Sequence, residues 1–165
     1  MGCDMTAIDL LLTQLDEAYS RRSWHGTNLR GSIRGVTATA AAWRPAPGRH
    51  NIHELVVHAA YWKYAVRRKF TGERRASFPL EGSNWFPRLR ADERAWRNDI
   101  RLLDEAHRRL RAVIAELDDR QLTLTPRGSS VSNRAILTGI VAHDLYHAGQ
   151  IQLLKRLRTS PGGGV

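Results

Sequence analysis

The chain has 165 residues, of which 42% are hydrophobic and 25% are charged. These proportions are those of an ordinary globular domain and exclude a disordered chain. The single cysteine, Cys3, excludes an internal disulfide and a cysteine-rich zinc site. No apolar run approaches the ~20 residues that a membrane span requires, and residues 1–16 lack the basic start of a signal peptide. We therefore expect a cytoplasmic protein with one domain over residues 1–160 and a disordered tail at 161–165.

The net charge is +10, from 26 Lys and Arg against 16 Asp and Glu. Such an excess is typical of proteins that bind nucleic acid or anionic membranes. However, only three of the basic residues are Lys, and an excess of Arg over Lys is often a coding bias of GC-rich genomes. No block of roughly five or six like charges occurs. A solvated, Arg-rich surface is therefore the favoured interpretation, and a basic nucleic-acid-binding module is the alternative.

The N-terminal segment predicts a long helix. It begins near Asp4 or Thr6 and continues to about Ile33, with a kink where Gly26 and Gly31 stand, because each glycine costs about 1 kcal/mol against alanine. Its apolar residues recur at spacings of three and four, which is the pattern of one buried helix face. They are Ile8, Leu11, Leu12, Leu15, Ala18 and Tyr19.

A loop and a second helix follow. Residues 43–49 contain two prolines and a glycine, which mark a loop. Asn51 is the predicted N-cap of the second helix, and Glu54 stands three residues later, in the position of a capping box. The helix runs to about Phe70 and ends at Thr71–Gly72, because glycine is the residue that most often terminates a helix.

The second half of the chain predicts an irregular segment and two more helices. Residues 73–90 are broken by proline and glycine, and a long loop in a compact domain is often functional. A third helix is expected over Ala91–Leu117. A fourth helix, capped by Ser130 or Ser132, reaches about Arg158. Four long helices without a strand predict an all-α four-helix bundle.

Histidines on two of these helices indicate a metal site. His143 and His147 are four residues apart, so both imidazoles project from one face of the fourth helix, and Gln150 follows on the same face. His58 stands on an otherwise apolar stretch of the second helix. Buried histidines need partners, and a divalent metal ion is one that three imidazoles can share. Alone, the His-x-x-x-His spacing arises often by chance.

Two segments together carry a resemblance to a known family. They are Asn51–Trp62, with the sequence NIHELVVHAAYW, and His143–Ile151, with the sequence HDLYHAGQI; shorter matches lie at Trp24–Gly26, Arg44–Pro45 and Gly82–Pro87. In these segments the chain resembles the DinB-like branch of the DinB/YfiT-like superfamily of metalloenzymes. The resemblance implies a four-helix bundle in which three histidines hold a divalent metal, usually zinc or nickel. The three ligands fall on His58, His143 and His147.

The resemblance also implies a class of activity. A site with three histidine ligands leaves a coordination position open, which is typical of a catalytic centre. The implied function is a thiol-dependent transferase or a hydrolase that acts on a small molecule, with a low-molecular-weight thiol as a further cofactor. A metal-binding bundle without catalysis is a second interpretation, and relatives of the family often form homodimers.

Glu54 and Gln150 are candidate catalytic residues. Glu54 lies one turn before His58, where it can orient that imidazole, act as a general base or simply cap the helix. Gln150 lies on the face of His143 and His147, where it can form a hydrogen bond with a ligand or substrate.

Four other residues have an expected position. His53 stands where the family usually has tryptophan; it is about 140° round the helix from His58, so we interpret it as a surface or cap variant. Asp144 is expected in a pair on the helix surface. His25 is a candidate cavity residue, and His107 is expected in the core, within an apolar stripe of the third helix.

Overall fold

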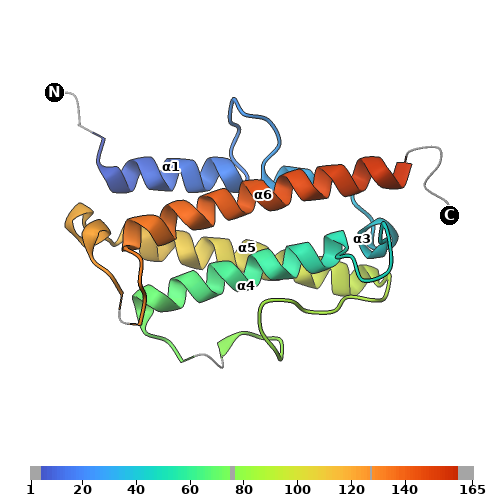
Figure 1. Cartoon of the computed structure of the whole chain (residues 1–165). Coiled ribbons are helices and arrows are strands. Elements are labelled where there is room, and N and C mark those ends of the chain that lie inside the picture. Colours follow the sequence, from blue (N-terminus) through green and yellow to red (C-terminus); the bar gives the residue numbers. More distant parts are fainter. Residues whose placement is uncertain (1–4, 75–76, 127, 160–165) are drawn as a thin grey trace.

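Four long helices form the body of the molecule and lie side by side (Figure 1). The computed structural model describes residues 5–74, 77–126 and 128–159, and these residues contain no strand. The prediction of an all-α bundle is confirmed. The long helices are α1 (Ala7–Tyr19), α4 (Ile52–Thr71), α5 (Glu93–Ala115) and α6 (Asn133–Thr159); the short ones are α2 (Leu29–Ser32), α3 (Ala38–Ala42) and the 3₁₀ helix η2 (Asp119–Thr123).

The boundaries of α4 and α6 agree with the expected capping residues. The Asn51 side chain accepts a hydrogen bond from the backbone N–H of Glu54, at 2.8 Å, and so caps α4. At its other end Gly72 adopts φ 69°, a left-handed conformation that glycine takes without strain. The Ser132 hydroxyl accepts from the N–H of Ala135 at the start of α6. The tail predicted at 161–165 lies outside the described residues.

The prediction of one helix from Thr6 to Ile33 is wrong. The first helix ends at Tyr19, and a loop that stands away from the bundle separates it from α2 (Figure 1). The reason is local: Gly26 has φ 108°, which does not fit a helix, and Asn28 starts a separate helix by accepting a hydrogen bond from Gly31 N–H.

Two apolar clusters fill the bundle. One packs the first half of α4 against α2, α3 and the last turns of α6, and the other packs α1 and η2 against the opposite ends of α4 and α6. Between them, α4 and α6 place buried polar side chains that need partners. These are His58 and Lys63 on α4, and Asp144 and His147 on α6. These four buried polar side chains lie where α4 and α6 meet.

Among the described helices, none combines the length and the apolar character required to cross a bilayer.

Candidate metal centre

Three imidazoles converge where α4 faces α6. The Nε2 atom of His143 lies 3.1 Å from Nε2 of His58 and 3.0 Å from Nε2 of His147. The ligand atoms of the three histidines all lie within 4.8 Å of one another. The spacing of four residues puts two of them on one face of α6, as the sequence predicted, and the packing of α4 supplies the third.

The outer nitrogens of two rings fix the direction of their lone pairs. Nδ1 of His58 donates to the backbone carbonyl of Asn84 at 2.8 Å, and Nδ1 of His147 donates to Oε1 of Gln150 at 2.7 Å. Because each Nδ1 then carries the proton, each Nε2 presents a bare lone pair to the common centre. Nδ1 of His143 is buried and has no hydrogen-bond partner among the described residues.

The electrostatic state of the rings also favours a cation. Burial lowers the pKa of His58 to about 4 and, together with the other two imidazoles, that of His143 to about 3. Burial lowers the pKa of His147 as well. All three rings are therefore neutral at physiological pH, and three neutral imidazoles with converging lone pairs fit a divalent metal ion.

The loop before α5 forms a wall of this centre. Trp85 stacks on His58 with 3.8 Å between ring centroids, and on His50 with 3.6 Å. Two rings stacked so closely cannot share one face of the indole, so Trp85 lies between the two imidazoles. The neighbouring Asn84 has φ 64°, an unusual value for a residue other than glycine, and its side chain accepts from Nε1 of Trp62 at 2.9 Å.

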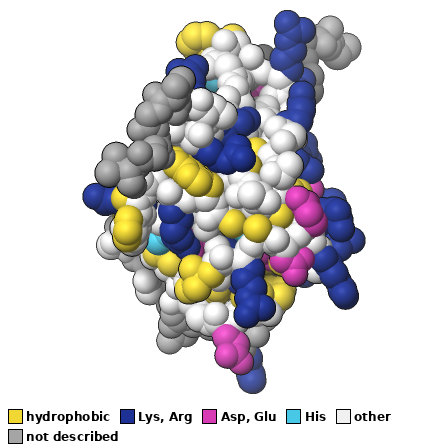
Figure 2. All heavy atoms as spheres, turned by 90° about the vertical axis from the view of Figure 1, so that its right-hand side faces the viewer, with side chains coloured by type: hydrophobic (Ala, Val, Ile, Leu, Met, Phe, Trp, Pro, Cys, Tyr) yellow, Lys and Arg dark blue, Asp and Glu magenta, His cyan; other side chains and the backbone are white. Residues whose placement is uncertain are grey.

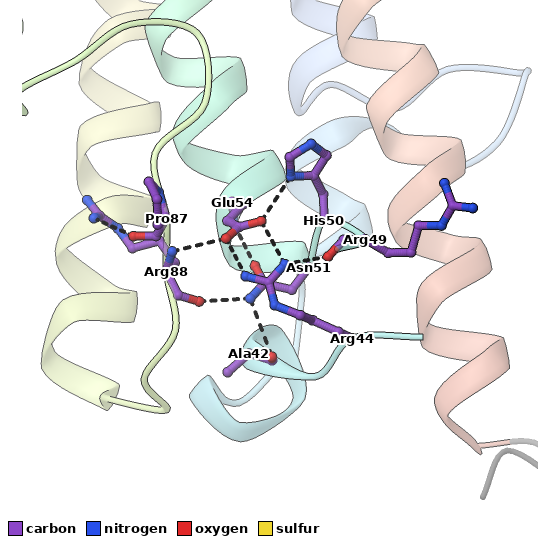
Figure 3. Close-up of polar contacts among 8 residues, drawn as sticks. All are labelled: Ala42, Arg44, Arg49, His50, Asn51, Glu54, Pro87 and Arg88. Atoms are coloured by element: carbon purple, nitrogen blue, oxygen red, sulfur yellow. Dashed lines mark hydrogen bonds and ion pairs between the residues drawn. The ribbon is translucent and has the colours of Figure 1, made fainter. Parts of the chain in front are cut away.

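Glu54 is the centre of a hydrogen-bonded cluster beside this wall (Figure 3). Its buried carboxylate accepts from both terminal nitrogens of Arg44 and from the backbone N–H of Arg88, and it bonds Nδ1 of His50 at 3.0 Å. Burial raises the pKa of Glu54, but the bonds from Arg44, His50 and Arg88 outweigh it and hold the pKa at about 2. Glu54 is therefore ionised, and its contacts are to His50 rather than to His58.

A pocket opens next to His147. Its volume is about 470 Å³, and its walls come from the loop before α4, from α4 itself, from Trp85 and from α6. Most of the lining is apolar. The lining residues are Pro45, Ala46, Arg49, His50, Leu55, Trp85, Tyr146, His147, Gln150, Leu153, Leu154 and Leu157.

Two of the expected positions are wrong. His53 is not a surface residue: it is fully buried, its Nε2 lies 2.8 Å from Oδ2 of Asp99, and its ring meets the edge of Trp96. Asp144 is not in a surface pair: it is fully buried in an ion pair with Lys63. Residues on the far side of a helix stripe are buried here because a third helix, α5 or α1, covers them.

Of the two other expected positions, that of His107 agrees with the structure and that of His25 does not. His107 lies in the core, stacked on Tyr19 at 3.7 Å between centroids, as expected. His25 is exposed in the loop between α1 and α2 and does not line the pocket. His50 lies in the loop before α4, and the sequence did not single it out as a site residue. The sequence also did not reveal the Asn84 carbonyl, because a backbone acceptor leaves no signal in a sequence.

Comparison with known families agrees with this geometry. A family model described as the DinB superfamily matches residues 21–151, which include all three histidines. The chain belongs to the DinB superfamily. Neither the comparison with curated proteins nor that with solved structures finds a match. Membership confirms the resemblance that the two histidine segments indicated. Among the described residues, the group of His, Cys, Asp and Glu side chains that could hold a metal ion at this place consists of His58, His143 and His147.

Proposed function

We propose that this chain is a metal-dependent enzyme of the transferase or hydrolase kind that acts on a small molecule. The observation that carries the proposal is the convergence of three Nε2 lone pairs, within 4.8 Å of one another, beside an open pocket. Zinc or nickel is the expected metal, because imidazole nitrogen suits both ions. A low-molecular-weight thiol is the proposed co-substrate of the transferase reaction.

The three-ligand arrangement supports catalysis rather than a purely structural site. Structural zinc sites are usually closed by four protein ligands, whereas catalytic sites keep one position for substrate or water. When bound, the metal supplies a Lewis acid that polarises a carbonyl or lowers the pKa of a coordinated water or thiol. The pocket beside His147 gives a small molecule access to that position.

The residues around the ligands hold them in place. Gln150 and the Asn84 carbonyl fix the rings of His147 and His58, and such outer partners typically raise metal affinity about 10- to 100-fold. Trp85 covers one face of His58 and shields it from water.

Glu54 acts through His50. The carboxylate accepts the Nδ1 proton of His50, so the Nε2 of that ring is the basic nitrogen, and it has no hydrogen-bond partner among the described residues. His50 lines the pocket, where it can take up or release a proton of the bound substrate. We therefore propose that Glu54 positions His50 and that His50 exchanges a proton with the substrate. A direct catalytic role of Glu54 stays a prediction.

Metal titration tests the proposal. Protein purified without a histidine tag and stripped with a chelator is titrated with Zn²⁺ and Ni²⁺ by calorimetry. We expect one equivalent to bind, and we expect His58→Ala and His147→Ala each to weaken binding by at least about 100-fold. His25→Ala is the matched control, because this exposed histidine lies outside the centre. Metal binding that both ligand variants leave unchanged refutes the centre.

Loaded protein is then tested for two reactions, the consumption of a low-molecular-weight thiol with an electrophile and the hydrolysis of small esters. His50→Gln should lower kcat while metal content stays unchanged. If the protein binds one equivalent of metal but catalyses neither reaction, the proposal of an enzyme is refuted, and the chain is a metal-binding bundle without catalysis.

A further inference from the structure

One stripe of α6 forms the floor of the pocket beside the metal centre. His147, Gln150, Leu154 and Leu157 follow one another at spacings of three, four and three, so they share one helix face. At 1.5 Å per residue the stripe is about 15 Å long. The pocket therefore extends well beyond the metal ligands, toward the C-terminal end of α6.

The walls of this pocket are apolar, and some of their side chains remain exposed to solvent. Leu153 retains 57% of its exposure and Leu157 retains 42%, although both line a concave surface together with Leu55 and Trp85. Apolar side chains that line a hollow favour a ligand that removes them from water. The body of the ligand is therefore expected to be aliphatic or aromatic.

The charge of the side chains that line the pocket is positive. Among the described residues that line the pocket, Arg49 is the one Lys or Arg, and none is Asp or Glu. The Glu54 carboxylate is bound by Arg44, and the Arg49 side chain points away from that cluster toward α6 (Figure 3). No ion pair of the Arg49 guanidinium is found in the part of the chain that the structure describes. This cation is free to bind an anion.

The face of the molecule at the α3 end has the same mixed character. Hydrophobic side chains lie between basic ones on it, and the acidic side chains visible there lie mainly to one side (Figure 2). This distribution attracts molecules that combine an apolar body with a negative charge.

We propose that the pocket binds an apolar carboxylate as the substrate of the metal centre. Its aliphatic or aromatic body lies along the leucines of α6, and its carboxylate pairs with the Arg49 guanidinium, which presents a fork of donors that suits this group. The proposal rests on the proposed function for the reaction that follows, but binding itself requires only the pocket.

Calorimetry with two matched probes tests the inference. Octanoate carries the charge and octanamide lacks it, while their hydrocarbon bodies are alike. With metal-free wild-type protein we expect octanoate to bind about tenfold more tightly than octanamide, the factor for one charge-assisted hydrogen-bonded pair. Arg49→Gln should abolish this preference and leave octanamide binding unchanged. Arg22→Gln, a change of another exposed arginine, is the control and should leave both affinities unchanged.

A second variant tests the apolar wall. Leu157→Asn should weaken both probes by the same factor, roughly five- to tenfold, because it removes part of the shared apolar contact and leaves Arg49 in place. Circular dichroism and Zn²⁺ titration of the same samples show whether the variants fold and keep the metal centre. A failure of Zn²⁺ binding thus counts against the proposed function alone.

Three results overturn the inference. If octanoate and octanamide bind the wild type equally well, Arg49 does not pair with the carboxylate. If neither probe binds, the pocket is not a binding site for apolar carboxylates. If sedimentation shows a dimer that Leu157→Asn dissociates, and the probes bind neither form, the α6 stripe is a subunit interface instead.

Discussion

The buried ion pair between Lys63 and Asp144 gives the sharpest test of how α4 and α6 are held together. Both side chains are fully buried, and the Lys63 ammonium donates to Oδ2 of Asp144. Asp144 directly follows the proposed ligand His143, so the pair joins the two helices beside the candidate metal centre. Burial raises the pKa of Asp144, and the charge of Lys63 opposes this effect. We predict that Lys63→Met destabilises the protein severely.

The magnitude follows from the fate of the remaining carboxylate. Without Lys63 the buried Asp144 avoids an unpaired charge by taking up a proton. For a carboxyl with an ordinary pKa of about 3.9, that proton costs ~1.4 kcal/mol per pH unit, or ~4 kcal/mol at about pH 7. This agrees with the roughly 3–5 kcal/mol usually lost when one partner of a buried pair is removed.

The sign of the pH dependence follows from the same step. In Lys63→Met the folded state binds a proton at a higher pKa than the unfolded state does. The stability of the variant is therefore greatest at acidic pH and decreases as the pH rises. The difference from the wild type should shrink from ~4 kcal/mol at about pH 7 to ~1.5 kcal/mol at about pH 5.

Urea denaturation in the presence of a chelator, followed by far-UV circular dichroism, measures these changes without a contribution from metal. Asp144→Leu, which leaves the lysine unpaired, should cost a similar ~4 kcal/mol, and the double variant should recover at least ~3 kcal/mol of the summed losses. Additive losses in the double variant, or a penalty below ~1 kcal/mol for Lys63→Met, refute the reasoning.

Three further outcomes are expected. Burial lowers the pKa of His107 to about 3, so the unfolded state binds an extra proton as the pH falls below about 6.5. His107→Gln should therefore reduce the loss of stability in acid by up to ~1.4 kcal/mol per pH unit, as measured by urea denaturation. An unchanged slope of the unfolding free energy against pH contradicts this. Gln150→Ala should weaken Zn²⁺ binding by about 10- to 100-fold in calorimetry, whereas Gln152→Ala, which alters a surface bond to Thr27, should not. A short DNA duplex should show no binding at low salt by fluorescence anisotropy; tight, steeply salt-dependent binding would instead favour the nucleic-acid alternative.

Several features were predictable because their causes are local. The caps of α4 and α6 depend on side chains that hydrogen bond their own helix ends, and Asn51, Gly72 and Ser132 all lie where the sequence indicated. The His143–His147 pair follows from helix geometry alone. The prediction of a single continuous first helix was wrong: α1 ends at Tyr19, and Gly26, whose φ of 108° does not fit a helix, lies in the loop that follows.

The sequence by itself determined the helical class from its periodicity and the His143–His147 pair from its spacing, because both are properties of one chain segment at a time. The resemblance of two segments to a known family gave the superfamily and indicated His58 as the third metal-binding candidate. The tertiary structure alone decided that His53 and Asp144 are buried, since helices distant in sequence cover them. It also placed the Asn84 carbonyl behind His58 and turned Glu54 toward Arg44 and His50. Such contacts join separate elements through backbone atoms and packing. They do not correspond to any regular spacing of residues, so the sequence does not reveal them.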